Sequence, residues 1–443
     1  MKKLPEVCPL CGLPKELCIC KTIAKEEAKI RVYTSRRSLG KFVTIIEGID
    51  EKAKIVTMID MGGSQRRRKA RIPGMGVILS QILWREMGSG GTVRLYNWGT
   101  GNMSLKIFTE PLLPAIEAEL QHQVARLDEP RTRPFYEMLT YHMGWSGEGA
   151  GMEAQGKRIR PLLVLLTYAA CRSDWQSDLQ SALPAAACVE LIHNFSLVHD
   201  DIQDKSDLRR GRLTVWKKWG EAHAINAGDA LFILAHLSLS ELKDKFTADA
   251  ALKVEAVIDR ACLDLTRGQY LDMSYENQSG LTIKDYWLMV AGKTAALLSA
   301  CTHVGAILGN ADESTQEAYR DFGHYLGLAF QVHDDYLGIW GDSALTGKST
   351  DSDLLTGKKS LPVLYGLGKD GPFARRRAEG PLSAEEVPAL AEQLAREGAK
   401  AFTQETADQM TDLALQSLRQ ANPQAEAGEA LFELANLLSN RQS

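Results

Sequence analysis

Two groups of aspartates dominate the chemistry that this sequence can offer. Asp200, Asp201 and Asp204 form a DDxxD pattern, and Asp334 and Asp335 form a second acidic pair. Residues four apart share one face of a helix, so Asp200 and Asp204 would stand together. Carboxylates this close repel one another unless cations neutralise them, and Mg²⁺ prefers such oxygen ligands. The spacing therefore predicts magnesium sites that bind diphosphate oxygens.

Basic residues accompany both acidic groups, in numbers that suit two diphosphates. They are Lys157, Arg158 and Arg160, then Arg209 and Arg210, then Lys293, and finally Lys348 and Lys358 in a Gly/Ser/Thr-rich stretch. Arginine contacts phosphate in a planar, bidentate manner, and lysine acts as a point charge. Taken singly, these residues would be read as surface charges. Because both acidic groups adjoin apolar runs, we expect a buried site that holds one diphosphate through metals and one through cations.

Helical periodicity covers most of the chain beyond residue 108. Apolar residues recur every three or four positions, which predicts helices. The clearest stretches are 112–127, 161–170, 183–198, 227–242, 252–265, 291–308, 318–335, 387–394 and 430–438. Strand-like alternation is missing from this part of the sequence. The sequence therefore predicts an all-α fold, a large helical bundle around a central cavity with the acidic groups near helix ends.

The sequence divides by charge near residue 108. Residues 1–108 carry 20 Lys and Arg against 9 Asp and Glu, whereas residues 109–443 carry 32 against 47. A net charge of −4 and 44% hydrophobic residues exclude a disordered or collagen-like protein. The longest apolar run, 161–171, is shorter than the roughly 18 residues of a membrane span, and no signal peptide opens the chain. We expect two parts, no membrane span and a cytoplasmic location.

Four cysteines, Cys8, Cys11, Cys18 and Cys20, crowd the first twenty residues. Thiolates this close in a reducing compartment suit one tetrahedral zinc ion, the alternative being unliganded thiols in a frayed terminus. Strand-like runs at 29–34 and 42–47 flank a basic turn and predict a β-hairpin. Dispersed cysteines usually behave as core residues, which is what we expect of Cys171, Cys188, Cys262 and Cys301.

Residues 4–50 resemble the N-terminal part of archaeal-type translation initiation factor 1, through CPLCGLPKELCIC, RRSLGK and FVTIIEGID. The resemblance implies a zinc-binding arm and a basic loop that contacts RNA. It stops near Asp50, and an incomplete domain cannot bury a normal core. We therefore expect an initiation-factor-like segment at 1–54, a basic, Gly-rich linker without an assigned fold at 55–108, and a helical catalytic domain at 109–443.

Residues 109–443 resemble the trans-polyprenyl diphosphate synthases, a family that includes geranylgeranyl and farnesyl diphosphate synthases. The motifs, in order, are QGKRIRP, ELIH ahead of DDIQD, LRRGR, INAGDAL, GQYLD, GKT, and FQVHDDYLGIWGD followed by GK. The resemblance implies an isoprenoid-synthase-type bundle and a prenyltransferase of isoprenoid biosynthesis. Such an enzyme joins isopentenyl diphosphate to an allylic diphosphate. We also expect a homodimer.

The resemblance assigns roles to single residues of this sequence. It implies three magnesium ions held by Asp200, Asp204 and Asp334, with Asp201 and Asp335 orienting these ligands and Asp272 one step further from the metals. It implies that isopentenyl diphosphate is gripped by Lys157, Arg158, Arg160, His193 and Arg210. The allylic diphosphate would be neutralised by Arg209, Lys293, Lys348 and Lys358, and the cation stabilised by Thr294 and Gln331.

Product length is expected to depend on Phe195, which lies five residues before Asp200, with Ile192 and Ser196 beside it. An aromatic residue at this position resembles short-chain, archaeal-type geranylgeranyl synthases, so we expect a twenty-carbon product; a farnesyl diphosphate synthase is the alternative. Gly338 stands where the second acidic motif commonly ends in Asp. We expect the first aspartate of that motif to suffice.

Two other classes of function remain open, and a non-catalytic subunit is a third alternative that the presence of both acidic groups disfavours. A class I terpene cyclase uses the same magnesium chemistry but has no second diphosphate to hold, so the basic residues argue against it. An RNA- or ribosome-binding factor would act through residues 1–108, but the initiation-factor resemblance covers only part of a domain. Consumption of isopentenyl diphosphate distinguishes the prenyltransferase from both.

Overall fold

The computed structural model of the chain describes four strands at 30–36, 42–48, 55–60 and 96–99, and then residues 103–172, 178–341 and 352–439. The chain divides into two compact units, Met1–Met103 and Ser104–Ser443. The strands of the first unit are described by their backbone alone. The predicted zinc ligands Cys8, Cys11, Cys18 and Cys20 lie outside the described residues, and so does Lys348.

The first unit contains a four-stranded antiparallel sheet in the order β1-β2-β3-β4. Its strands are β1 (Ile30–Arg36), β2 (Phe42–Gly48), β3 (Ile55–Asp60) and β4 (Tyr96–Gly99). Arg36 pairs with Phe42 at the end of the first hairpin, which confirms the predicted pairing of the first two strands. The strands β3 and β4 fall in the segment 55–108, for which the sequence predicts no fold.

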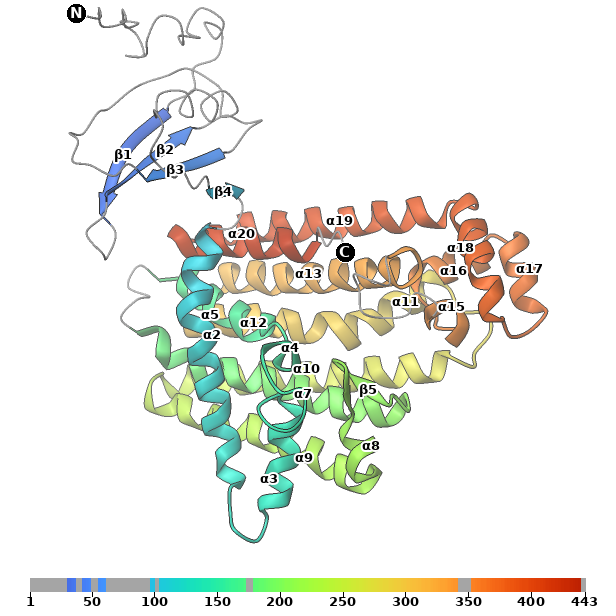
Figure 1. Ribbon diagram of the computed structural model, residues 1–443, viewed down its shortest axis with the longest axis horizontal. Helices are drawn as coiled ribbons and strands as arrows, with labels where there is room; N and C mark the ends of the chain where they lie inside the picture. The colour runs from blue at the N-terminus through green and yellow to red at the C-terminus, as the bar shows by residue number, and fades with distance from the viewer. Residues whose placement is uncertain are drawn as a thin grey trace, which may run out of the picture. The chain divides into compact units, whose positions relative to one another are not determined.

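The second unit is helical, which confirms the predicted fold class (Figure 1). Its first half contains α2 (Met103–Val124), α3 (Arg133–His142), α4 (Met152–Gln155), α5 (Ile159–Ala170), α7 (Leu183–Gln203), α8 (Val215–Trp219), α9 (Glu221–Leu239) and α10 (Ala248–Tyr275). Its second half contains α11 (Ile283–Val290), α12 (Ala296–Leu308), α13 (Glu313–Trp340), α15 (Ser352–Thr356), α16 (Leu361–Gly368), α17 (Pro372–Ala378), α18 (Val387–Arg396), α19 (Ala399–Gln420) and α20 (Ala425–Ser439).

Shorter elements join these helices. Single turns of 3-10 helix lie at Ala125–Leu127, Leu179–Ala182, Ser240–Asp244 and Ala384–Glu386, and a π-helical turn lies at Ala291–Ala295. A two-stranded ribbon, β5 (Leu208–Arg209) and β6 (Arg212–Leu213), follows α7. This ribbon carries the basic residues that follow the first acidic group.

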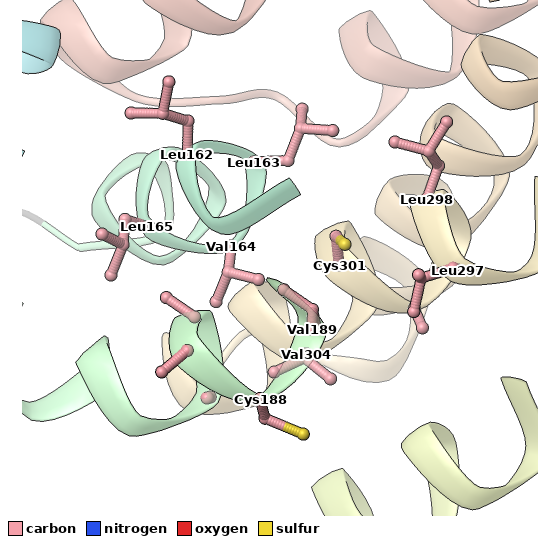
Figure 2. Close-up of a cluster of buried hydrophobic side chains, with 14 of the residues drawn as sticks. Leu162, Leu163, Val164, Leu165, Cys188, Val189, Leu297, Leu298, Cys301 and Val304 are labelled. Carbon is pink, nitrogen blue, oxygen red and sulfur yellow. The ribbon is translucent and has the colours of Figure 1, made fainter. Parts of the chain in front are cut away.

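The core of the second unit forms where α5, α7 and α12 meet. Every residue of α5 from Pro161 to Ala170 is buried, as expected of a helix that is apolar on all sides. Figure 2 shows Leu162, Leu163, Val164 and Leu165 of α5 gathered with Cys188 and Val189 of α7 and with Leu297, Leu298, Cys301 and Val304 of α12. The predicted core role of the dispersed cysteines is confirmed for Cys188, Cys262 and Cys301, while Cys171 is half-buried.

Two stretches of the described residues, Leu179–Gln203 and Ile283–Leu308, are long and apolar enough to cross a membrane by length and composition alone. Both are longer than the longest uninterrupted apolar run, 161–171, because polar residues interrupt them. The most apolar windows of the two stretches are 72% and 67% buried within the fold. Core helices of globular proteins meet the same criteria, so these stretches do not indicate a membrane protein.

Candidate active site

The first acidic group lies at the C-terminal end of α7. Asp201 is 1% exposed, and Arg209 of β5 holds it with a guanidinium-to-carboxylate distance of 2.8 Å. Burial raises the pKa of Asp201 even though Arg209 opposes this effect. The sequence predicts that Arg209 contacts the allylic diphosphate, but here its guanidinium is paired with a carboxylate of the acidic group. Its contact with Asp201 fixes the ribbon against α7.

Asp200 lies among charges that come from several helices. Burial raises its pKa to about 6, with Asp204 and Asp272 adding to the rise, while Lys293 and Arg209 lower it. Lys293 also forms an ion pair with Asp272 of α10. Asp200 of α7 and Asp272 of α10 therefore face the same ammonium group. The exposed Asp204 stands at the end of α7, where its backbone N–H donates to the Asp200 carbonyl at 2.8 Å.

The π-helical turn at Ala291–Ala295 presents Lys293 and Thr294 to the site. It begins where α10 comes so close that a Cβ at Gly268 would overlap the backbone of Gly292 and Lys293. Only glycine permits this approach. A π-turn widens the helix locally and is frequent at functional sites. Here it turns two adjacent side chains towards α10 and α13.

The second acidic group lies on α13, and a chain of hydrogen bonds links it to the π-turn. Thr294 Oγ1 donates to Gln331 Oε1 at 2.7 Å, and Gln331 Nε2 donates to Asp335 Oδ1 at 2.9 Å. The Leu361 N–H donates to the other Asp335 oxygen at 3.0 Å. Asp335 is 2% exposed, and burial raises its pKa to about 6. Its carboxylate is thus held in place by α13 and by the start of α16.

Lys358 interacts electrostatically with the second acidic group and with Asp272 of α10. Burial alone would lower the pKa of its ammonium group, but four carboxylates together raise it above its ordinary value. These carboxylates are Asp353, Asp335, Asp272 and Asp334, in decreasing order of influence. Asp272 also pairs with Lys293, so one carboxylate connects the two predicted lysines. Asp353 of α15 is a residue that sequence reasoning missed, although it stands between two lysines that the family resemblance identified.

Arg158 occupies a different place from the one that the sequence predicts for it. Its side chain is 2% exposed, and its guanidinium contacts Glu117 at 2.5 Å and Glu190 at 2.8 Å. Its φ of 49° is a left-handed conformation at the start of α5. A guanidinium held by two carboxylates is poorly placed to bind a diphosphate, so the geometry favours a structural role. The two carboxylates join α2 and α7 to the start of α5.

The other residues of the basic group surround a site that suits an anion. Arg160 has a buried Nε for which the described residues provide no hydrogen-bond partner. Burial, together with Arg160, Arg210 and Arg209, holds the pKa of His193 well below its ordinary value, so its imidazole is neutral. Arg210 donates to the Ala154 carbonyl at 2.7 Å, and Lys157, three residues after Ala154, is exposed. An unpartnered buried guanidinium nitrogen is costly unless a ligand satisfies it.

His142 of α3 is a second residue that sequence reasoning missed. Burial lowers its pKa to about 3, and Arg209, Arg210 and Arg158 add to this effect. Its Nε2 is buried without a hydrogen-bond partner among the described residues. No motif signals this residue, because it ends a short helix that precedes the basic motif by more than ten positions.

The predicted chain-length residues lie together on α7. Ile192 is completely buried, and Ser196 donates to the His193 carbonyl at 2.8 Å. Phe195 is half-buried and packs against the hydrophobic core. These positions place an aromatic ring on α7 about 7.5 Å along the helix axis from Asp200, at 1.5 Å per residue.

The donor set of the acidic groups fits magnesium bound together with a diphosphate. Among the described residues there is no group of three or more His, Cys, Asp or Glu side chains arranged to hold a metal ion alone. Magnesium usually keeps several waters and binds through one or two carboxylates plus substrate phosphates, so such a preformed group is not required. Buried carboxylates with raised pKa values, as at Asp200 and Asp335, are groups whose charge a divalent cation would compensate.

Comparison with known proteins identifies relatives of this chain. A family model described as "Polyprenyl synthetase" matches residues 150–391. A geranylgeranyl diphosphate synthase of Mycobacterium tuberculosis is 37% identical over 338 residues, covering 75% of this chain and 93% of that protein. A (2E,6E)-farnesyl diphosphate synthase of Mycobacterium bovis is 43% identical over 265 residues, covering 59% of this chain and 70% of that protein.

Solved structures share the helical fold. A polyprenyl synthetase from Streptomyces coelicolor aligns with a TM-score of 0.66 at 35% identity, covering 74% of this chain and 98% of that chain. A geranylgeranyl pyrophosphate synthetase from Pyrococcus horikoshii aligns with a TM-score of 0.68 at 30% identity, covering 76% and 98%.

Proposed function

The chain belongs to the polyprenyl synthetase family, whose members are prenyltransferases, and on that premise we propose that it makes geranylgeranyl diphosphate. It would condense isopentenyl diphosphate with dimethylallyl, geranyl and farnesyl diphosphates. One observation carries the proposal best: Asp272 faces both Lys293 and Lys358, and these lysines in turn face the carboxylates of α7 and α13. This arrangement supports the proposal that the two acidic groups serve one site, as a metal-bound allylic diphosphate requires.

The allylic half of the site would ionise its substrate. Asp200, Asp204 and Asp334 are the proposed magnesium ligands, and the bound metal would stabilise negative charge on the departing diphosphate. Lys293 and Lys358 would donate hydrogen bonds to the same leaving group. Asp201 is fixed by its contact with Arg209, and Asp335 by its hydrogen bonds with Gln331 and Leu361. Both residues would therefore keep the adjacent aspartates in position.

The homoallylic half of the site would hold isopentenyl diphosphate by cations. Lys157, Arg160 and Arg210 are the proposed charged contacts, and the neutral His193 would contribute a hydrogen bond. Thr294 and Gln331 are hydrogen-bonded to each other, and their oxygen dipoles would stabilise the carbocation. The double bond of isopentenyl diphosphate would attack that cation, and the proton released would pass to the departing diphosphate.

A second candidate product is farnesyl diphosphate. The geranylgeranyl and farnesyl diphosphate synthases described above are 37% and 43% identical to the chain, so sequence identity alone does not distinguish the two products. We favour the twenty-carbon product because the aromatic ring of Phe195 lies five residues before Asp200, about 7.5 Å along the axis of α7. A class I terpene cyclase is disfavoured because the basic half of the site would then have no substrate.

A homodimer is part of the proposal, and cytoplasm is the proposed location. Large apolar side chains are exposed along two neighbouring helices: Ile225, Ile233 and Leu237 on α9, and Leu252 and Leu263 on α10. Such a face commonly marks a protein interface. A monomer in sedimentation equilibrium at micromolar concentration would contradict this part of the proposal. Zinc binding and RNA contact by the N-terminal segment stay predictions from the sequence.

The proposal is tested by supplying magnesium, isopentenyl diphosphate and one allylic primer at a time, and by measuring product chain length. We expect all three primers to be consumed and geranylgeranyl diphosphate to accumulate. Farnesyl diphosphate as the end product would select the second candidate. A primer that reacts equally well without isopentenyl diphosphate would identify a cyclase instead.

A further inference from the structure

The two strands of the ribbon β5–β6 carry leucines on one face and arginines on the other. Leu208 pairs with Leu213, and Arg209 pairs with Arg212. Cross-strand partners share a face and successive residues alternate between faces, so the two leucines stand together on the side away from the arginines. Leu208 is 61% and Leu213 46% exposed, whereas both arginines are half-buried. The ribbon therefore presents an apolar outer face to solvent.

The inner face anchors the ribbon to the helical unit. Arg209 pairs with Asp201 of α7 at 2.8 Å. Arg212 donates to the carbonyls of Tyr141 and Ser146 at 2.7 and 2.6 Å. These contacts hold the ribbon in one orientation and so keep its leucines turned outward. Exposed apolar side chains that gather on one face commonly mark an interaction surface.

Lysines precede and follow the ribbon, and each rests on an aromatic ring. The indole N–H of Trp216 donates at 2.8 Å to a backbone carbonyl two residues before β5, which fixes α8 beside the ribbon (Figure 1). Nζ of Lys205 and Nζ of Lys217 lie 5.5 and 5.4 Å from the centroid of the Trp216 ring. Nζ of Lys218 lies 4.7 Å from the centroid of the Trp219 ring. All three lysines are exposed, so their stems pack on the rings while their ammonium groups stay at the surface.

The charge of this segment is opposite to that of the unit that carries it. Residues 205–219 contain six Lys and Arg against one acidic residue, whereas residues 109–443 contain 32 against 47. Carboxylates neutralise part of the excess, since Lys217 pairs with Asp207 at 3.0 Å and Lys205 pairs with Glu221. The remaining positive charge suits an anionic partner. Leucines between lysines favour a bilayer with acidic headgroups over a nucleic acid, because only the bilayer offers an apolar interior for them to enter.

We propose that the outer face of the β5–β6 ribbon docks onto a bilayer that contains anionic lipid. Leu208 and Leu213 enter the headgroup region, and the neighbouring lysines contact lipid phosphates. Binding of this kind is peripheral and reversible, because two leucines bury little apolar area and each lysine adds only a modest attraction. The inference does not depend on the proposed function, although the two are connected. The ribbon begins four residues after Asp204, so a twenty-carbon diphosphate product would leave the enzyme beside the membrane that takes it up.

The test measures flotation of the full chain with vesicles of phosphatidylcholine, alone or mixed in equal parts with phosphatidylglycerol. We expect binding to the mixed vesicles that weakens with added salt. Leu208→Ser combined with Leu213→Ser should bind at least about tenfold more weakly, and Lys218→Gln about fivefold more weakly. Leu437→Ser is the matched control, because this leucine of α20 is 46% exposed, as Leu213 is, and its loss should leave binding unchanged.

Three results would overturn the inference. The first is a ribbon double variant that binds like the wild type, which would assign vesicle binding to another part of the chain, such as the basic residues 1–108. The second is equal binding to vesicles with and without phosphatidylglycerol. The third is a ribosomal RNA fragment that binds the wild type but not the double variant while vesicles bind neither, which would make the ribbon a nucleic-acid surface.

Two controls keep the outcome clear. If the double variant does not fold by circular dichroism, Leu213→Ser alone asks the same question with a smaller change. Turnover in buffer without vesicles separates this inference from the proposed function, since the ribbon variants should turn over at the wild-type rate. A wild type that binds vesicles but does not consume isopentenyl diphosphate would defeat the proposed function and leave the docking surface standing.

Discussion

The Asp353 carboxylate of α15 lies where a Cβ at Gly338 of α13 would stand, so a side chain at Gly338 requires this carboxylate to move. A Cβ at Gly338 would overlap Asp353 Oδ2 and lie 3.0 Å from its Cγ. Asp353 is also the carboxylate with the largest influence on Lys358. The glycine that replaces the last aspartate of the second acidic motif thus makes room for an aspartate from another helix, so the local negative charge is retained.

Restoring the missing aspartate should therefore harm the enzyme. Gly338→Asp would bring a second carboxylate onto Asp353, and overpacking of this kind costs about 1–3 kcal/mol. We expect a lower melting temperature, weaker magnesium activation and at least tenfold lower kcat, roughly 1.4 kcal/mol in the barrier. Gly338→Asp combined with Asp353→Gly should recover part of the loss. Tighter magnesium activation by Gly338→Asp alone would contradict the packing relationship.

Two adjacent residues of the basic motif should separate stability from substrate binding. Arg158→Ala would leave Glu117 and Glu190 without their shared partner, and breaking a buried ion pair costs about 3–5 kcal/mol. Lys157→Ala changes an exposed side chain, so it should preserve stability and raise the KM for isopentenyl diphosphate. Urea unfolding and steady-state kinetics on both variants check this. An Arg158→Ala protein as stable as the wild type would refute the structural role.

The hydrogen bonds from Thr294 through Gln331 to Asp335 should act as one unit. Thr294→Val and Gln331→Met should each lower kcat about tenfold, because each leaves a buried polar partner unsatisfied, at a cost of about 1–3 kcal/mol. The double variant should lose less than the product of the two effects, with a coupling of at least about 0.5 kcal/mol. Ser299→Ala is the control, since that hydroxyl donates to the Arg320 carbonyl outside the chain of bonds. Additive losses would show that the residues act separately.

The buried Asp335 should make stability depend on pH in a defined direction. Its pKa is about 6 in the fold and about 3.9 in an unfolded chain, so the folded state binds more protons between these values. The contribution of Asp335 to the free energy of unfolding therefore falls as the pH rises from about 4 to about 6. Relative to the wild type, Asp335→Asn should become more stable across this window, by up to about 3 kcal/mol.

The comparison with Asp335→Asn is needed because other groups act in the opposite direction. His142 and His193 have lowered pKa values, so they favour the folded state as the pH rises towards their ordinary value. Denaturant unfolding of both proteins in EDTA, at several pH values, isolates the aspartate. Added magnesium should stabilise the wild type more at pH 7.5 than at pH 5. A difference in stability that does not vary with pH would contradict the prediction.

The sequence predicted well those parts of the site that periodicity and motifs record directly. Helical spacing places Asp200 and Asp204 at the end of one helix, and the apolar runs beside them predict that they face inward. The position of Lys293 beside Asp272 was not predictable from spacing. It depends on the π-turn and on the close approach of Gly268 and Gly292, which no periodicity reveals.

Residues with the same chemistry in one motif could not be told apart from the sequence. Arg158 and Arg160 are two positions apart, yet only Arg158 forms ion pairs with Glu117 of α2 and Glu190 of α7. Both glutamates lie more than 30 residues from it in the sequence. Asp353 was missed because it belongs to neither acidic motif. Its carboxylate lies beside Gly338, a position without a side chain, and interacts there with Lys358. The strands β3 and β4 were missed because a sheet that joins residues 55–60 to 96–99 spans a long stretch without a motif.

The central claim is that the carboxylates of α7 and α13 serve one prenyl-transfer site. The most direct measurement is the rate at which labelled isopentenyl diphosphate is joined to geranyl diphosphate by the wild type, Asp200→Ala and Asp334→Ala, with magnesium present. The account predicts measurable turnover by the wild type and a loss of at least about 10²-fold in kcat for each variant, with the fold retained by circular dichroism. Either variant turning over at the wild-type rate would contradict it.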